Sequence, residues 1–362
     1  MHEPYTPPTL PLKSGEINNL YFLDELIDST AKLEVYKEKI RDSKLNASWF
    51  MPTLQQKEAL ASSALEGTQA TLDGVLTYQS IPDKEDINLN EVNNYYDATI
   101  LGCRLLSDRH FTEDFFCEIH KALMSGNVRK NGAIGEYRVK QNYIGKNDAS
   151  HEITFVPPSP DKVPELMHNL IEYINTPADA FRPLVRAAII HAQFETIHPF
   201  GDGNGRVGRI LIPMYLYASK QIDLPCFFIS EALEHNKFKY YALLNDTREK
   251  GNWNEWIRFF LQTVDSQCEK YIQIISAINA IYDRDLSSAC ESIKSSNAVA
   301  VMNTLFKYPV TTSKQIQKET GLPPASVNRL MNALVEKRIL FTNNKQRGRI
   351  FYYYDLLEIL RG

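Results

Sequence analysis

Cysteine is scarce in this chain, and long apolar runs are missing from it. The five cysteines are scattered, odd in number and never spaced as C-x-x-C, a usage typical of reduced thiols in a cytoplasm. No stretch approaches the ~20 apolar residues of a membrane span. The opening MHEPYTPPTLPLKSGE has prolines and acids where a signal peptide needs an apolar run. We therefore expect a cytoplasmic protein without a membrane partner.

Internal repeats and low-complexity tracts are also missing, and no charge of one sign dominates. The net charge is only −4. It is unevenly divided, because residues 297–362 hold ten Lys and Arg against four Asp and Glu, while the rest holds thirty against forty. A tail of about +6 favours nucleic acid or an acidic partner, and a mixed, solvated surface is the alternative.

Apolar residues are present in sufficient number for a sizeable core. With 362 residues, 43% of them hydrophobic, the chain is long enough for two or three domains. Apolar residues recur at intervals of three and four from Leu20 to about Arg129 and again from Asp161 to about Ser292, which predicts helices. Between these regions, IGEYRVKQNYIG and HEITFVPP are rich in strand-forming residues and joined by the turn-forming KNDAS. We expect a β-hairpin there.

The tail divides differently from the rest of the chain. It contains a predicted helix (AVAVMNTLFKY), a short helix from Ser313, a GLPPAS turn, a second helix (ASVNRLMNALVEKR) and a hairpin (ILFTNNKQRGRIFYYY). Pro323 and Pro324 block helix continuation, and Ser326 is suited to cap the helix that follows. This order of elements predicts a winged helix.

The most informative segment is HPFGDGNGRVGR, residues 198–209. Gly203, Asn204 and Gly205 predict a tight turn, and the apolar run after Arg206 predicts that a helix begins there. Glycines let a ligand approach the free amides of a helix start closely. The segment is therefore a predicted anion site.

The charged residues of this segment extend its chemistry. Arg206 and Arg209 lie three apart on one face of the predicted helix, where two cations beside the positive helix end favour a bound polyphosphate. Asp202 is a hard oxygen ligand suited to hold Mg²⁺ against a phosphate pair. His198 is a candidate general base near neutral pH. Each residue alone is more often structural, but together they predict transfer of a phosphorus group from a Mg-nucleotide.

These residues resemble the signature of the Fic (Fido) family, HPF-x-D/E-GNGR-x-x-R, at every position. The resemblance extends over roughly residues 50–265 and includes residues 134–138, which are similar to the family's AGxYR turn. A second glycine-rich arrangement, which a kinase needs, is absent. The resemblance implies AMPylation, in which AMP passes from ATP to a Ser, Thr or Tyr hydroxyl of a target protein and pyrophosphate is released. Related sites that transfer phosphate or phosphocholine, or that remove AMP, are the alternatives.

The resemblance also implies a role for each residue of the motif. His198 deprotonates the acceptor hydroxyl, and Asp202 holds Mg²⁺ between the α- and β-phosphates. Phe200 packs inward and anchors the loop. The phosphates are held by the backbone of the turn, by the Asn204 side chain and by both arginines, a set that comprises Gly203, Asn204, Gly205, Arg206 and Arg209.

The predicted hairpin resembles the flap with which the family pairs an extended segment of the target protein. Backbone pairing of this kind needs little target sequence. We expect the contact strand at Asn142, Tyr143, Ile144 and Gly145. The alternative is that these are ordinary hairpin residues.

A segment after the motif, KYYALLNDTREKGNW, resembles the family's lining of the adenine pocket. Tyr240 is the candidate for contact with the base, and Tyr241 and Arg248 are the alternatives. Before the motif, His191 and Glu195 lie in a mostly apolar helix. They are interpreted as buried structural hydrogen-bonding groups, or else as support for the loop.

The stretch SSALEG closes a predicted helix, TLQQKEALASSALEG, at its glycine. A glutamate at this negative end of the helix dipole is mildly disfavoured. Ser62, Glu66 and Gly67 match the family's inhibitory pattern, Ser/Thr-x-x-x-Glu-Gly/Asn. The resemblance implies that Glu66 pairs with Arg209, takes it from the γ-phosphate and leaves ATP bound in a non-productive pose, with Ser62 steadying Glu66. The alternative role of this carboxylate is to orient a water that removes AMP.

These features predict the fold class, the domains and the partners. We expect a mainly α protein with a Fic-type helical core, a β-hairpin flap and a small C-terminal winged helix-turn-helix domain. The expected parts are an extended arm (1–19), N-terminal helices with the inhibitory helix (20–110), the Fic catalytic core (111–265), a connecting helix and linker (266–296) and the winged helix (297–362). ATP and Mg²⁺ are the expected ligands and a target protein the expected partner. A homodimer fits the family, although no sequence feature identifies an interface.

A competing hypothesis makes the winged helix the functional part, as a DNA-binding module. Its second helix and wing carry residue types that contact DNA, namely Asn328, Arg329, Asn332, Lys337, Arg347 and Arg349. Plain protein contact or a dimer scaffold are the alternatives for this domain.

Overall fold

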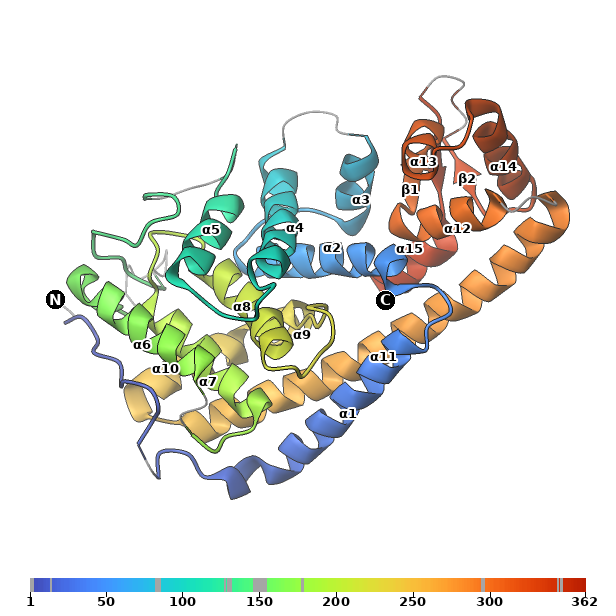
Figure 1. Ribbon diagram of the computed structural model, residues 1–362. Helices are drawn as coiled ribbons and strands as arrows, with labels where there is room; N and C mark the ends of the chain where they lie inside the picture. Colours follow the sequence, from blue (N-terminus) through green and yellow to red (C-terminus); the bar gives the residue numbers. More distant parts are fainter. Residues whose placement is uncertain are drawn as a thin grey trace.

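Helices build most of this chain, and one small sheet lies near its C-terminal end (Figure 1). The computed structural model describes residues 3–13, 15–81, 86–126, 128, 132–145, 155–176, 179–293, 297–343, 345 and 348–362. The mainly α prediction is confirmed. Among the described residues, no helix is both long and apolar enough to cross a membrane.

A long helix and a shorter partner run along one side of the molecule. The long helix is α11 (Trp253–Ile293), and α1 (Leu23–Arg41) lies beside it (Figure 1). α11 continues without a break past residue 265, where we expected the catalytic core to end. One element therefore joins the central helices to the C-terminal domain.

The remaining helices up to α11 surround a common core. They follow one another in chain order as η1 (Asn19–Phe22), α2 (Ala47–Leu65), α3 (Leu72–Ser80), α4 (Ile87–Leu105), α5 (Glu113–Leu123), η2 (Pro160–Lys162), α6 (Val163–Asn175), α7 (Pro183–Ile197), α8 (Asn204–Ala218), α9 (Ser230–His235) and α10 (Lys237–Lys250).

The two helices that flank the motif are the central ones. Every residue of α7 from Leu184 to Ile197 is buried, and so is every residue of α8 from Arg206 to Leu216. A helix that is buried all round belongs to the interior of a protein. The loop between α7 and α8 is therefore held at both ends by the core.

α2 is the helix that we expected to end at Gly67. It begins after the cap residue Asn46, whose side chain accepts from the Ser48 amide, and Glu66 is its C-terminal cap residue. The Lys237 ammonium donates to the Leu65 carbonyl oxygen at 2.7 Å. A cation thus faces the negative end of the helix dipole next to Glu66.

The C-terminal domain follows the predicted order of a helix, two further helices and a β-ribbon, with one strand and one helix more. Its elements are α12 (Asn297–Lys307), β1 (Val310–Thr312), α13 (Ser313–Thr320), α14 (Pro324–Glu336), β2 (Phe341–Thr342), β3 (Ile350–Tyr352) and α15 (Tyr354–Arg361). The antiparallel sheet has the strand order β1-β3-β2, with Tyr352 opposite both Val310 and Phe341. The strand β1 and the final helix α15 were not predicted.

The start of α14 differs from the sequence expectation. Ser326 lies inside this helix, so the predicted cap is wrong. The helix begins at Pro324 after the extended residue Pro323, and no side chain caps it. Proline suits a first helical position because its fixed φ is already helical and its missing N–H would have had no partner.

The C-terminal domain packs against the N-terminal helices α2 and α3 and against α11. The Ser80 hydroxyl donates to the Val310 carbonyl oxygen at 2.5 Å, and Arg361 pairs with Asp73 at 2.5 Å. The helix that ends at Glu66 is therefore in contact with the C-terminal domain through α12 and α15.

Only the base of the predicted hairpin lies within the described residues. Ile144 and Phe155 form an antiparallel bridge, with N–O distances of 3.0 and 3.2 Å. The predicted turn KNDAS and the residues 151–154 lie outside the described part of the chain.

Candidate active site

The motif forms a loop between two left-handed residues. His198 ends α7 with φ 50° and ψ 60°, and Gly203 precedes α8 with φ 76° and ψ 4°. A left-handed backbone is rare for residues other than glycine, so the conformation of His198 requires support from its surroundings. The loop turns the chain from one buried helix directly into another.

Arg138 supplies part of that support, and it comes from the AGxYR-like turn. Its Nε donates to the His198 carbonyl oxygen at 2.8 Å, and its Nη2 donates to the carbonyl oxygens of Pro158 at 2.5 Å and Ile197 at 3.4 Å. Its own amide donates to the Pro199 carbonyl oxygen at 2.9 Å. Arg138 thus satisfies carbonyl groups that the end of α7 leaves free.

Asn204 closes the loop on itself. Its side-chain oxygen accepts from the Phe200 amide at 2.8 Å, and its side-chain nitrogen donates to the Phe200 carbonyl oxygen at 2.9 Å. The side chain is buried and does not line the cavity described below. Its amide thus holds the loop together, and the expectation that it also binds phosphate stays a prediction.

Phe200 is fully buried, as the predicted role of a loop anchor requires. Its ring stacks on the imidazole of His120 in α5, with ring centres 4.0 Å apart and planes 5° apart. The loop is thus packed against α5 as well as against α7 and α8.

A cavity of about 560 Å³ opens beside the loop. Most of the predicted site residues meet there, although they come from α2, the predicted flap, the loop and α8. Its lining comprises Glu66, Asn142, Tyr143, Ile144, Gly145, Phe155, Glu195, His198, Gly201, Asp202, Gly205, Arg209, Tyr241, Leu244, Asn245 and Arg248.

Other predicted residues lie around this cavity without lining it. The predicted residues that do not line the cavity are Ser62, Gly67, Phe200, Gly203, Asn204, Arg206 and Tyr240. Of these, Ser62 and Phe200 are fully buried.

Arg209 is completely buried and is held by α2. Its Nη2 lies 2.6 Å from Glu66 Oε1 and donates to the Ser62 carbonyl oxygen at 3.0 Å. Its Nε donates to the Ser62 hydroxyl at 2.8 Å. The expected contact between Glu66 and Arg209 is present. Ser62, however, bonds to the arginine rather than to Glu66 in the described hydrogen bonds.

Some N–H groups of the two arginines have no partner in the described part of the chain. They are Nη1 of Arg209 and Nε and Nη1 of Arg206, and both side chains are buried. Arg206 makes one long contact there, from Nη2 to the Met124 sulfur at 3.6 Å. Buried donors without partners are uncommon, and cationic ones favour an anionic ligand.

The ionisable groups of the cavity are shifted in opposite directions. Burial, with the nearby charge of Arg248, lowers the pKa of His198 to about 3, so its imidazole is neutral at physiological pH. Burial alone would raise the pKa of Glu66, but the charge and hydrogen bond of Arg209 outweigh it and hold that pKa below its usual value. Glu66 therefore stays ionised beside the arginine.

Glu195 is a third carboxylate that lines this cavity, beside those of Glu66 and Asp202. Burial raises its pKa to about 7, against the opposing charge of Arg209. Its Oε1 has no hydrogen-bond partner among the described residues. A Cβ at Gly208 would lie 2.2 Å from that oxygen, so the glycine makes room for it. Glu195 is thus not a fully hydrogen-bonded structural group.

Tyr241, rather than the predicted Tyr240, faces the cavity. Tyr240 is fully buried, and its hydroxyl lies 2.9 Å from His191 Nε2, while His191 Nδ1 lies 3.0 Å from the Gly208 carbonyl oxygen. A carbonyl can only accept, so Nδ1 carries the proton and Nε2 accepts from the tyrosine. Adjacent residues point to different sides of a helix, so Tyr240 is buried in the core while Tyr241 lines the cavity.

Two family descriptions match this chain. The Fic/DOC family matches residues 110–216, and the Fic/DOC family N-terminal domain matches residues 23–104. Together they cover just over half of the chain.

The chain contains a Fic/DOC domain together with the N-terminal domain of that family. Among curated proteins, it is 29% identical over 245 residues to protein adenylyltransferase fic-1 of Caenorhabditis briggsae, which is 65% of this chain and 44% of the relative. It is also 29% identical over 216 residues to the protein of the same name in Caenorhabditis elegans, which is 58% of this chain and 38% of the relative. This Fic chain thus spans less than half the length of these relatives.

Solved structures share the fold. A Fic family protein from Desulfovibrio desulfuricans G20 superposes with a TM-score of 0.61 at 18% identity, covering 97% of this chain and 98% of that one. Fic-1 of Caenorhabditis elegans, residues 134–508, superposes with a TM-score of 0.52 at 23% identity, covering 70% of this chain and 74% of that one. The first comparison extends over the C-terminal domain as well as the Fic domain.

A divalent metal fits the cavity only together with a ligand. Among the described residues, no three His, Cys, Asp or Glu side chains are grouped so that they could hold a metal ion. Asp202 provides a carboxylate at the cavity wall. Mg²⁺ is usually held by one or two carboxylates with substrate phosphates and water, so this donor set fits a magnesium ion that arrives with a nucleotide.

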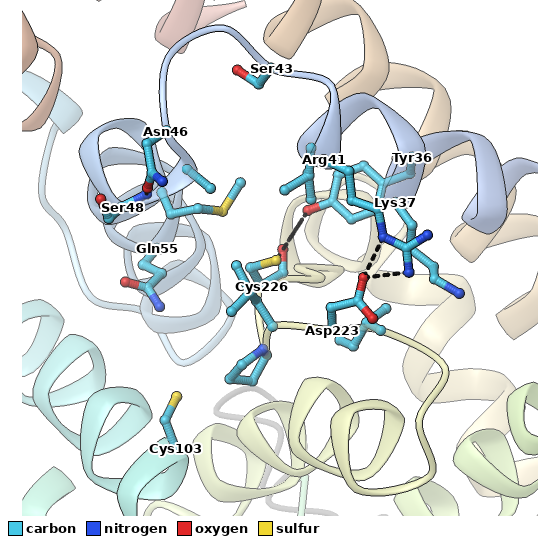
Figure 2. A pocket seen from close by; sticks show the side chains of 16 residues that line it. Tyr36, Lys37, Arg41, Ser43, Asn46, Ser48, Gln55, Cys103, Asp223 and Cys226 are labelled. Carbon is cyan, nitrogen blue, oxygen red and sulfur yellow. Dashed lines mark hydrogen bonds and ion pairs between the residues drawn. The ribbon is translucent and has the colours of Figure 1, made fainter.

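A second cavity, of about 640 Å³, lies on another side of the Fic chain between α1, α2 and the loop before α9 (Figure 2). Two pairs of its polar residues bond to each other (Figure 2). The Tyr36 hydroxyl donates to the Cys226 carbonyl oxygen at 2.5 Å, and Arg41 pairs with Asp223 at 2.7 Å. None of the motif residues lines this cavity.

Proposed function

We propose that this protein is a protein adenylyltransferase that transfers AMP from ATP to a hydroxyl group of a target protein and is held inactive by Glu66. One observation carries the proposal. Arg209 reaches the cavity that contains His198, gives one N–H to the carboxylate of Glu66, and has another N–H without a partner among the described residues. The names of the curated relatives support the same activity.

His198 is suited to act as the base. Its Nδ1 lies 3.3 Å from the Glu195 carbonyl oxygen, to which it donates, so the lone pair is on Nε2. A neutral imidazole with this tautomer can accept the proton of an incoming hydroxyl. The hydroxyl oxygen then bonds to the α-phosphorus, the bond from that phosphorus to the bridging oxygen breaks, and pyrophosphate leaves.

The arginines and the start of α8 are suited to hold the phosphates. Gly205 lies at the cavity wall in the first turn of α8, where amide groups are free for an anion. A side chain at this position would collide with Glu66, since its Cβ would lie 2.3 Å from Oε1. Mg²⁺ bound at Asp202 would offset phosphate charge. Tyr241 and Arg248 would face the base, in place of Tyr240.

Glu66 lies where it would oppose a triphosphate. Its carboxylate occupies Nη2 of Arg209 and places a negative charge at the mouth of the phosphate region. We propose that the pair must open before the γ-phosphate reaches Arg209. The flap residues Asn142 to Gly145 line the same cavity and are suited to register a target segment beside His198.

The deciding experiment compares ATP labelled in the α- or the γ-phosphate, with Mg²⁺ and a cell lysate. We expect α-label on protein for Glu66→Gly well above the wild type, and a loss of at least about 100-fold when His198→Ala is added. Incorporation of γ-label instead would mean phosphate transfer. Equal α-labelling of the wild type and Glu66→Gly would remove the inhibitory role of Glu66.

The winged-helix alternative concerns the C-terminal domain. Asn328, Arg329, Asn332 and Lys337 are exposed, and Arg349 Nη1 donates to the Asn332 side chain at 2.8 Å. Arg347 lies outside the described residues. Affinity for random duplex DNA that falls with salt, and that is reduced by Arg349→Ala, supports DNA binding; no affinity at low salt excludes it.

A further inference from the structure

His120 lies at the meeting point of three segments that are separate in the sequence. It belongs to α5 and is 1% exposed. Its Nδ1 lies 2.9 Å from the Gly135 amide, which belongs to the AGxYR-like turn. Its Nε2 lies 3.1 Å from the carbonyl oxygen of Asp202, which belongs to the motif loop.

The two partners determine the protonation of this imidazole. The Gly135 amide can only donate, so Nδ1 must be the acceptor. The Asp202 carbonyl can only accept, so Nε2 must carry the proton. The two hydrogen bonds together therefore select one neutral tautomer of the ring.

The C-terminal part of α5 packs against the motif loop at Gly203. A Cβ on Gly203 would lie 3.6 Å from the His120 ring and 3.2 Å from the Met124 sulfur. Asp202 is therefore held in two ways. Its carbonyl oxygen is held by His120, and its Oδ1 accepts from the Gly203 amide at 2.6 Å.

We infer that His120 is a positioning residue for the transfer reaction, which sets the direction of the Asp202 carboxylate by fixing the Asp202–Gly203 peptide. This inference rests on the proposed function. The bond to Asp202 matters for nucleotide and Mg²⁺ binding, whereas the bond to Gly135 and the stack on Phe200 hold the fold. His120 lies outside the sequence motif, 78 positions before His198.

Two substitutions separate the two bonds. Asn has a polar atom where the imidazole has Nδ1, so His120→Asn keeps an acceptor for Gly135 and loses the donor to Asp202. Gln reaches as far as Nε2, so His120→Gln keeps the donor and loses the acceptor. Both variants lose the stack on Phe200 equally, which makes them matched controls.

The test uses the full chain with Glu66→Gly as parent, and it has two readouts. Calorimetry measures the affinity for α,β-methylene ATP, which cannot transfer AMP, in Mg²⁺ and in EDTA. Labelling with α-labelled ATP gives kcat and the Mg²⁺ concentration for half-maximal rate. Melting temperatures show whether each variant is folded.

For His120→Asn we expect the Mg²⁺-dependent gain in analogue affinity to fall by about 10- to 100-fold, as is typical when a partner of a metal ligand is removed. The EDTA value should change little. His120→Gln should remain within about threefold of the parent in both conditions. Equal losses in the two variants, or a larger loss in Gln, would overturn the inference, because the stack or the Gly135 bond would then be what matters.

Two further outcomes are covered: a variant that does not fold, and a parent that transfers no label. If His120→Asn does not fold, His120→Phe keeps the stack, loses both bonds and replaces it in the comparison with His120→Gln. A parent that binds the analogue but transfers no label contradicts the proposed function and leaves the calorimetric comparison valid. The two proposals therefore fail in different ways.

Discussion

The carboxylate of Glu66 and the guanidinium of Arg209 lie 2.6 Å apart, although 143 positions separate them in the chain. The arginine is completely buried, while the glutamate side chain is 36% exposed at the cavity. Ser62, one turn earlier on α2, takes two further N–H contacts of the same arginine. A movement of α2 would therefore remove all three contacts at once.

We expect the Glu66–Arg209 contact to persist throughout neutral pH. The pKa of Glu66 is lowered in the folded protein, so its contribution to stability is present above the unfolded value of about 4.5 and is lost as the pH falls through the folded pKa. With Glu195→Gln present in both proteins, so that the neighbouring carboxyl of pKa about 7 does not titrate, the stability difference between Glu66 and Glu66→Gln, measured by urea unfolding, should be constant between about pH 6 and 8 and shrink below about pH 4. A difference that disappears between pH 8 and 6 would contradict this.

The pair also makes Gly205 sensitive to substitution. A Cβ there would lie 2.3 Å from Glu66 Oε1 and 2.9 Å from Arg209 Nη1. We expect Gly205→Ala to lower the free energy of unfolding by about 1–3 kcal/mol, and by clearly less when Glu66→Gly is also present. Denaturant unfolding of the four proteins in this cycle measures the coupling. Additive effects would mean that Glu66 is not the group that limits the space.

Glu195 should make stability depend on pH in the opposite sense to Glu66. Its pKa is raised to about 7 by burial, so it contributes stability below the unfolded value of about 4.5, and this is lost as the pH rises towards 7. Relative to Glu195→Gln, the wild type should lose up to about 3 kcal/mol between about pH 5 and 8. Parallel stability profiles of the two proteins over this range would show that the carboxyl group titrates normally.

The two adjacent tyrosines should respond differently to substitution. Tyr240→Phe removes the hydroxyl that donates to His191 Nε2 inside the core, and we expect a loss of stability of about 1–3 kcal/mol with nucleotide affinity unchanged. Tyr241→Ala changes the cavity wall and should weaken nucleotide binding by about tenfold or more, with a smaller effect on stability. Calorimetry and thermal unfolding check both. If Tyr240→Phe weakened nucleotide binding and Tyr241→Ala did not, Tyr240 would be the residue that contacts the base.

Much of the site was predictable because its signals are local. The glycines of the motif predict a turn and the following apolar run predicts a helix; α8 is present, although it begins at Asn204, two residues before the predicted start at Arg206. The resemblance to the family pairs Glu66 with Arg209 from the residues of two short motifs alone. One local expectation was wrong, because Pro324 rather than a serine cap begins α14. The Asn204 side chain bonds within its own loop, and its contact with phosphate stays a prediction.

Residue type and spacing along the chain determined the glycine-rich turn, the charges around it and the end of α2 near Gly67, since these depend on neighbours within one or two turns. Tertiary structure alone decided which tyrosine faces the cavity and that His120 holds the Asp202 carbonyl. Successive residues on a helix point about 100° apart, so the side that meets the site follows from how α5, α7, α8 and α10 pack. That packing is set by apolar burial across the whole core, which no short segment contains.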